Sequence, residues 1–138
     1  MQLIPYLAFN GECEAAFKLY EKCFGGKIEG MWPYAGSPME SQVPAEWRSK
    51  LMHATLRVGD SLLHGFDAAP GSYQKPQGFS VSISLKDTAQ AERIFQALAD
   101  NGTVQFPFQE TFWAVRFGAL VDRFGIPWAV NCEKGAAL

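Results

Sequence analysis

The chain has 138 residues, of which 48% are hydrophobic, 14% aromatic and 19% charged. This length and composition predict one folded domain, 1–138, with a core of its own, and argue against a disordered chain. The formal net charge is −2. The sequence contains no run of Lys or Arg, so it lacks the basic surface that nucleic-acid binding requires. No apolar segment reaches the ~20 residues that span a bilayer, and we expect no membrane partner.

Three cysteines occur, Cys13, Cys23 and Cys132. Their odd number and their spacing do not match a metal site, so we expect free thiols in a reducing compartment. The first residues lack the charged start and the apolar stretch of a signal peptide. The sequence therefore predicts a cytoplasmic protein.

The first half of the chain shows the pattern strand, helix, strand, strand, strand. An apolar stripe with helical spacing indicates the helix, and Gly25-Gly26 ends it, as glycine does just past a last turn. Gly59-Asp60 predicts a tight hairpin turn between the last two strands. The predicted elements are a strand at 3–9, a helix at 12–24 and strands at 27–32, 51–58 and 61–66.

The second half repeats this order. Residues 79–85 alternate strictly between apolar and polar, which is typical of a half-buried strand. Asp87 is placed to cap the next helix, with Gln90 three residues on. That helix ends at 101–102, and strands follow at 103–106, 113–121 and 127–132. The internal duplication predicts an α+β fold of two βαβββ repeats, at about 1–70 and about 77–134.

The two repeats also agree in register when the first is shifted by 75 residues. Pro5 then falls on Ser80, on the face of the sheet opposite the helix. We expect the neighbouring residues of both first strands to face the helices: Ile4, Tyr6 and Ala8 on Phe79, Val81 and Ile83.

Because a helix covers one face of each sheet, the other face is left for a ligand or for the other unit. The hairpin turn pairs Thr55 with His64 and His53 with Phe66, which brings both histidines to this free face. Residues 52, 54, 56 and 58 point the opposite way, toward the helix. The predicted ligand-binding residues on the free face are His53, Thr55, Arg57, His64, Ser80 and Ser82.

Each of these residues has an alternative interpretation. The serines line a wet cavity or face bulk solvent. The two histidines are hydrogen-bonded residues on a sheet or metal ligands, and without a carboxylate on the same face they make an incomplete metal site.

Two loops are rich in aromatic residues, at 32–47 and 106–113. Clustered aromatics in loops suit the rim of a mostly apolar pocket, and Trp113 is a further candidate ligand-binding residue. The alternative is that these aromatics belong to the core or to a dimer interface. Glu110 is the candidate catalytic base, although no partner is visible that would tune it.

The combination of motifs resembles a known family across nearly the whole chain. The motifs are Ile4–Gly11, His53-Ala54, Phe112-Trp113, Phe117-Gly118, Asp122–Gly125 and Trp128. They are similar to the PhnB-like branch of the vicinal oxygen chelate superfamily, which includes glyoxalase I, extradiol dioxygenases and the fosfomycin and bleomycin resistance proteins. The resemblance implies a curled mixed sheet around a central cavity, often completed in a homodimer.

The resemblance also implies four metal-ligand positions, one on the first and one on the last strand of each unit. They fall on Pro5, His64, Ser80 and Ala129, of which only His64 is a good ligand. We therefore expect no bound cofactor; if a divalent metal is bound, His53 and His64 are its ligands. Relatives are often labelled ubiquinone-pathway methyltransferases, an activity we do not expect because no glycine-rich loop follows a strand.

The leading hypothesis is metal-independent binding of a small molecule in a cytoplasmic homodimer, comparable to the bleomycin resistance proteins. One alternative is a divalent-metal-dependent lyase, isomerase or dioxygenase that uses His53, His64 and Glu110. Another is a dimer without pocket chemistry, whose aromatic residues form the interface. Whether the protein is an enzyme stays open at this point.

Overall fold

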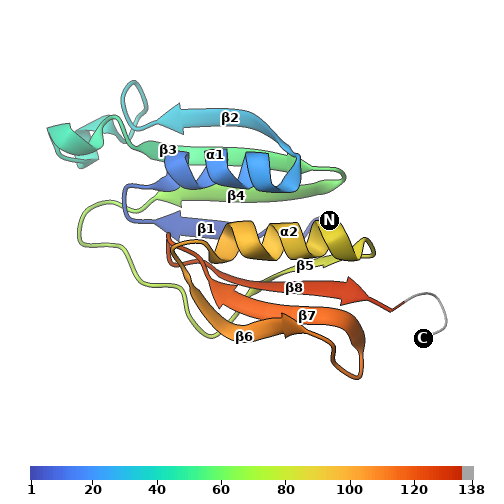
Figure 1. The fold of residues 1–138 in the computed structure, drawn as a ribbon. Coiled ribbons are helices and arrows are strands. Elements are labelled where there is room, and N and C mark those ends of the chain that lie inside the picture. The colour runs from blue at the N-terminus through green and yellow to red at the C-terminus, as the bar shows by residue number, and fades with distance from the viewer. Residues whose placement is uncertain (135–138) are drawn as a thin grey trace. The chain divides into compact units, whose positions relative to one another are not determined.

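The computed structural model describes residues 1–134. The chain divides into two compact units, Met1–Lys75 (unit 1) and Pro76–Leu138 (unit 2). Each unit contains a four-stranded sheet, in the order β1-β4-β3-β2 in unit 1 and β5-β8-β7-β6 in unit 2 (Figure 1). The first and last strands of each unit pair in parallel and the other neighbours are antiparallel. The predicted α+β fold of two βαβββ units is confirmed.

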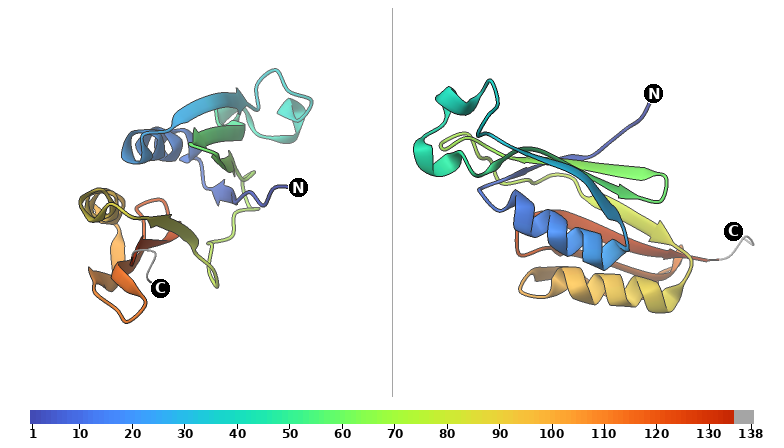
Figure 2. Two further views of the ribbon diagram at one scale, coloured as in Figure 1. Left: turned by 90° about the vertical axis from the view of Figure 1, so that its right-hand side faces the viewer. Right: turned by 90° about the horizontal axis from the view of Figure 1, so that it is seen from above.

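Unit 1 contains one long helix, which packs on a single face of its sheet (Figure 2). Phe9 and Phe17 form part of this packing, with ring centroids 6.1 Å apart. The helix ends at Phe24, and the next residue, Gly25, has a φ of 69°, a left-handed conformation that glycine adopts without strain. The elements are β1 (Tyr6–Phe9), α1 (Cys13–Phe24), β2 (Lys27–Pro33), short 3-10 helices at Glu40–Gln42 and Ala45–Trp47, β3 (Leu51–Val58) and β4 (Ser61–Asp67).

Unit 2 follows the same plan. The predicted cap is present: the Gln90 backbone N–H donates to the Asp87 carboxylate at 3.1 Å and so satisfies one free N–H of the first helical turn. The elements are β5 (Val81–Leu85), α2 (Thr88–Ala99), β6 (Thr103–Gln109), β7 (Ala114–Val121) and β8 (Pro127–Glu133). Among residues 1–134, no helix has both the length and the apolar character needed to cross a membrane.

Both first strands begin later than predicted. β1 starts at Tyr6 rather than at residue 3, directly after Pro5, which has no N–H to give to a sheet. β5 starts at Val81 rather than at Phe79, whose side chain is 54% exposed. The segment before β1 still reaches the sheet, because the Pro5 carbonyl oxygen accepts the backbone N–H of His64 at 3.0 Å.

The prediction that Ile4, Tyr6 and Ala8 face the helix is wrong. Leu7 and Phe9 are the buried residues of β1, and Tyr6 is 55% exposed. The reason is a difference in loop length: three residues (10–12) separate β1 from α1, whereas two (86–87) separate β5 from α2. The strands therefore match at a shift of 76 residues, not 75, which places Tyr6 on Ser82.

Two buried carboxylates join elements within the units. In unit 1, Asp67 accepts the backbone N–H of Cys13 through Oδ1 and that of Leu51 through Oδ2, each at 2.9 Å. In unit 2, the Asp122 carboxylate accepts the backbone N–H groups of Phe124 and Ile126 in the β7–β8 turn. It also accepts the indole N–H of Trp128 at 2.8 Å. Each aspartate thus satisfies backbone groups that would otherwise be buried without a partner.

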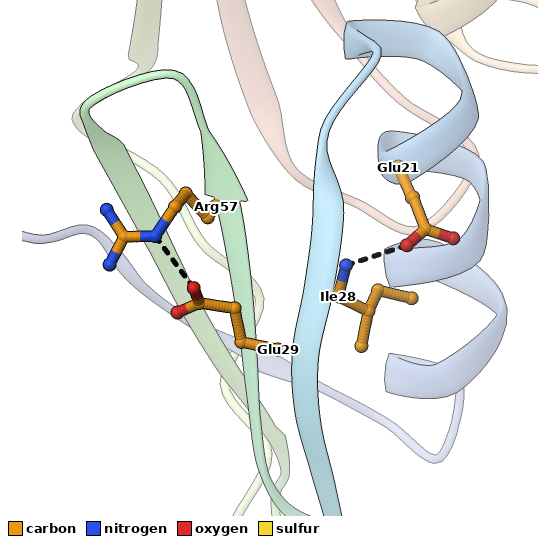
Figure 3. Close-up of polar contacts among 4 residues, drawn as sticks. All are labelled: Glu21, Ile28, Glu29 and Arg57. Atoms are coloured by element: carbon orange, nitrogen blue, oxygen red, sulfur yellow. Dashed lines mark hydrogen bonds and ion pairs between the residues drawn. The ribbon is translucent and has the colours of Figure 1, made fainter.

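Figure 3 separates the two faces of the unit 1 sheet. Ile28 lies toward α1, where its backbone N–H donates to Glu21 at 2.6 Å. Glu29 and Arg57 lie on the other face, joined by an ion pair of 2.7 Å. We call this other face the open face; its residues are Tyr6, Glu29, His53, Thr55, Arg57, His64 and Phe66.

Candidate functional site

Three strands bring Tyr6, His53 and His64 together on the open face. His64 on β4 pairs with Tyr6 on β1 and with Thr55 on β3, and the predicted pairing of Thr55 with His64 is confirmed. The two imidazole rings lie 4.9 Å apart between centroids. The Tyr6 ring lies 5.4 Å from the ring of His53 and 5.8 Å from that of His64, in edge-to-face contacts.

A chain of hydrogen bonds runs through His53. Its Nδ1 lies 2.8 Å from the hydroxyl of Tyr6, and its Nε2 lies 3.2 Å from the hydroxyl of Thr55. Both ring nitrogens of His53 therefore have partners. Within the described part of the chain, the ring of His64 makes no hydrogen bond.

Burial and neighbouring groups keep His53 and Tyr6 uncharged near neutral pH. The pKa of His53 is lowered, first by burial and then by the positive charge that His64 can carry. Burial raises the pKa of Tyr6, with a smaller contribution from Cys13. His53 is thus a neutral imidazole and Tyr6 a protonated phenol at pH 7.

An apolar pocket of about 520 Å³ adjoins the cluster. It is lined by Tyr6, Tyr34, Met39, Met52 and Phe66. The prediction that residue 52 points to the helix is wrong, because it lines this pocket together with two open-face aromatics. A β-bulge explains the change: Trp32 pairs with His53 and Pro33 with Leu51, so Met52 is an extra residue that turns out of the alternation.

The residues of the open face do not fit a metal centre. Among residues 1–134, no group of three or more His, Cys, Asp or Glu side chains is placed to hold a metal ion. His53 already uses both ring nitrogens, and Tyr6 occupies the β1 position that pairs with His64. The resemblance to the family places the metal-ligand position of the first strand on Pro5, one residue before Tyr6. A site that normally takes three or four protein ligands is not formed by these side chains.

Of the other predicted site residues, one is in unit 1 and the rest are in unit 2. Arg57 is on the open face but is paired with Glu29. In unit 2, Ser80 and Ser82 are exposed, and Ser82 rather than Ser80 pairs with Ala129. Glu110 is an exposed residue just after β6.

Trp113 is also in unit 2, where it belongs to a row of aromatic rings. Its ring centroid lies 4.9 Å from that of Phe112 and 5.3 Å from that of Phe117, and the Phe117 ring lies 5.7 Å from that of Phe106. We call these four residues the unit 2 aromatic row. Phe112 is 86% exposed and Trp113 is 42% exposed.

Sequence reasoning missed Tyr6, Met39 and Met52 as site residues. For Tyr6 the sequence does contain a signal. Leu7 and Phe9 are large apolar residues two positions apart, so the same strand pattern also allows Leu7 and Phe9 to face the helix and Tyr6 to face the other way. Met39 and Tyr34 line the pocket from the loop at 32–47, whose aromatic residues had indicated a pocket rim. The bulge that turns Met52 has no comparable signal in the sequence.

The fold defines a class of proteins. Two βαβββ units, each with its first and last strands paired in parallel, are the architecture of the vicinal oxygen chelate superfamily. The same fold occurs in a Bacillus cereus PhnB protein (TM-score 0.77, 18% identity, 95% of this chain and 98% of that one). It also occurs in a glyoxylase/bleomycin resistance protein/dioxygenase domain from Frankia sp. EAN1pec (TM-score 0.68, 11% identity, 97% and 98%).

The family is defined more narrowly by sequence. Residues 1–131 match the family model described as 3-demethylubiquinone-9 3-methyltransferase, and the chain belongs to this family, the PhnB-like branch of the superfamily. It is 32% identical to Protein YjdN of Escherichia coli K12 over 142 residues, 97% of each chain. It is 46% identical to protein PA1353 of Pseudomonas aeruginosa, whose crystal structure matches with a TM-score of 0.88 over 96% of this chain and 98% of that one.

Proposed function

We propose that this protein binds a small molecule, without a bound metal, in the apolar pocket beside the open face of unit 1. One observation carries the proposal: a pocket of about 520 Å³, with aromatic and methionine lining, lies next to a hydrogen-bonded Tyr6–His53–Thr55 chain. An apolar volume of this size with a few polar groups at its edge is typical of small-molecule sites. Methionines suit such a lining, because their unbranched thioether adapts to the shape of a ligand.

A ligand screen tests the proposal. We expect thermal-shift screening of metabolite and drug-like libraries to yield compounds that raise the melting temperature. Met39→Gln places a polar amide at the pocket and should weaken these compounds, whereas Val104→Gln, a matched change at an exposed apolar residue of unit 2, should not. A screen without binders, or binders that are indifferent to Met39→Gln, would contradict the proposal.

Metal analysis tests whether the protein lacks a bound metal, as the proposal requires. Protein purified without chelators should contain much less than one divalent metal ion per chain. The alternative, a metal-dependent lyase, isomerase or dioxygenase at His53 and His64, requires a stoichiometric metal that is lost in His64→Ala. Elemental analysis of the wild type and of this variant decides between the two.

We further propose that the protein is a cytoplasmic homodimer. The support for a dimer is the unit 2 aromatic row, because large apolar side chains that gather on a surface mark interaction sites. The support for the cytoplasm is the three cysteines, none of which forms a disulfide in the described part of the chain.

A further inference from the structure

Few side chains of the pocket can donate a hydrogen bond. Three of the five lining residues, Met39, Met52 and Phe66, have no polar hydrogen on the side chain. Tyr34 has one, but its hydroxyl donates to the backbone carbonyl oxygen of Asp67 at 2.6 Å. Among these five residues, Tyr6 is therefore the one whose side-chain hydrogen can be offered to a ligand.

The state of His53 decides whether Tyr6 can offer that hydrogen. A neutral imidazole has one N–H donor and one bare nitrogen acceptor. If the hydrogen is on Nε2, His53 donates to Thr55 and the Tyr6 hydroxyl is used up as donor to Nδ1. If the hydrogen is on Nδ1, His53 donates to the Tyr6 oxygen, Thr55 donates to Nε2, and the Tyr6 hydrogen is free.

Both arrangements use the same heavy-atom distances, 2.8 Å and 3.2 Å. They also require a neutral His53, which agrees with its lowered pKa, caused by burial and by His64. A ligand that accepts a hydrogen bond from Tyr6 therefore selects the Nδ1–H tautomer of His53. A ligand without an acceptor leaves the Tyr6 hydroxyl free to donate to Nδ1 of His53.

We propose that the unit 1 pocket selects molecules with a flat apolar ring and an acceptor oxygen, that is, aryl ketones or aryl carboxylates. Tyr6 donates to that oxygen while His53 holds its hydrogen on Nδ1. This inference rests on the proposed function and names the class of ligand for the same pocket. The ring packs against Tyr6, Phe66 and the two methionines, because aromatic rings and thioether sulfur make favourable contacts with a flat ring.

Charge on the open face agrees with an acceptor ligand. The carboxylate of Glu29 is engaged by Arg57 at 2.7 Å, so it does not oppose an acceptor oxygen in the pocket. The ring of His64, which makes no hydrogen bond in the described part of the chain, lies 4.9 Å from the ring of His53 on the same face of the sheet.

The experiment compares acetophenone with ethylbenzene, which have nearly the same shape and differ in one carbonyl oxygen. Binding of each to the full chain is measured by NMR titration. We expect acetophenone to bind about five- to tenfold more tightly, the gain of one net hydrogen bond. Tyr6→Phe should reduce this ratio to about one.

Thr55→Val is the matched control variant. It removes the partner of Nε2 in both tautomers, as the acceptor for the Nε2–H form and as the donor to the Nδ1–H form. Tyr6 keeps its hydroxyl in this variant, so the preference for acetophenone should persist. A merely structural role for the hydrogen-bond chain predicts the opposite, with Tyr6→Phe and Thr55→Val affecting both probes alike.

The ¹⁵N chemical shifts of the His53 ring, measured on the wild type, report the tautomer without any variant. In the acetophenone complex we expect the hydrogen on Nδ1. A hydrogen on Nε2 in that complex, equal affinity for the two probes, or an unchanged ratio in Tyr6→Phe overturns the inference. Binding of neither probe also overturns it, whereas the proposed function stands or falls on the wider ligand screen.

Discussion

At the scale of single residues, the buried carboxylate of Asp67 contributes to the stability of unit 1 through two hydrogen bonds. It is 1% exposed, and its two carboxylate oxygens accept the backbone N–H groups of Cys13 and Leu51. Asp67→Ala leaves both N–H groups buried without a partner, so we expect a loss of about 2–4 kcal/mol in the free energy of unfolding. Urea denaturation measures it.

Asp60→Asn is the control for this prediction, because it changes an aspartate that is exposed in the β3–β4 turn. Asp60→Asn should change the free energy of unfolding by no more than about 0.5 kcal/mol. Equal stabilities of Asp67→Ala and the wild type would show that the two hydrogen bonds of Asp67 contribute nothing to the fold.

His53 makes a second prediction at the residue scale, for pH. Because its pKa is lowered from 6.5 in the folded protein, the unfolded chain binds more protons in mildly acidic solution. The stability contribution of neutral His53 is complete above pH 6.5 and is lost as pH falls through its folded pKa. NMR titration should therefore find His53 titrating below 6.5.

His64→Gln separates the two causes of this shift. Removal of the neighbouring charge should raise the pKa of His53 partway, and burial, the larger cause, should keep it below 6.5. A His53 pKa at or above 6.5 in the wild type would contradict the placement of the two rings.

The candidate site shows which residues a sequence can reveal. The two-residue turn at Gly59-Asp60 fixes the pairing of Thr55 with His64, and with it the face that both histidines share. Tyr6 could not be placed in this way, because its strand pairs in parallel and no tight turn sets its register. Local turn chemistry therefore predicted the two histidines of the cluster, and long-range pairing decided the place of Tyr6.

At the scale of elements, each unit seats a helical phenylalanine over a glycine of its sheet. A Cβ at Gly65 would lie 2.5 Å from Phe17, and a Cβ at Gly118 would lie 2.5 Å from Phe95. Gly65→Ala therefore overpacks the interface between α1 and β4. We expect it to lower the free energy of unfolding by about 1–3 kcal/mol in urea denaturation.

A second variant tests the cause of that loss. Phe17→Leu removes the atoms that the new methyl would meet, so the double variant Gly65→Ala/Phe17→Leu should lose less stability than the sum of the two single variants. Simple addition of the two losses would show that the clash is not with Phe17.

The helices and strands were easier to predict from the sequence than the face of the sheet on which each strand residue lies. Apolar spacing and glycine stops predicted both helices and both hairpins, since these signals are local. One extra residue before α1 shifted the match between the two first strands, and a bulge turned Met52 to the other face. Side chains alternate with period two along a strand, so a change of one residue exchanges the two faces.

At the scale of the whole molecule, the proposed homodimer depends on the unit 2 aromatic row. Buried aromatics are the residues that contribute most at protein interfaces. Trp113→Ser should therefore raise the dimer dissociation constant about tenfold or more, as measured by sedimentation equilibrium. The free energy of unfolding of unit 2 should change little, because Trp113 is 42% exposed.

Phe79→Ser is the matched control for the dimer, because Phe79 is an exposed aromatic of unit 2 outside the row, at 54% exposure. Its removal deletes a similar apolar area from the surface and should leave the dissociation constant within about threefold of the wild type. If both variants weaken association equally, general surface hydrophobicity drives it rather than the aromatic row. If the wild type sediments as a monomer at every concentration, the homodimer is excluded.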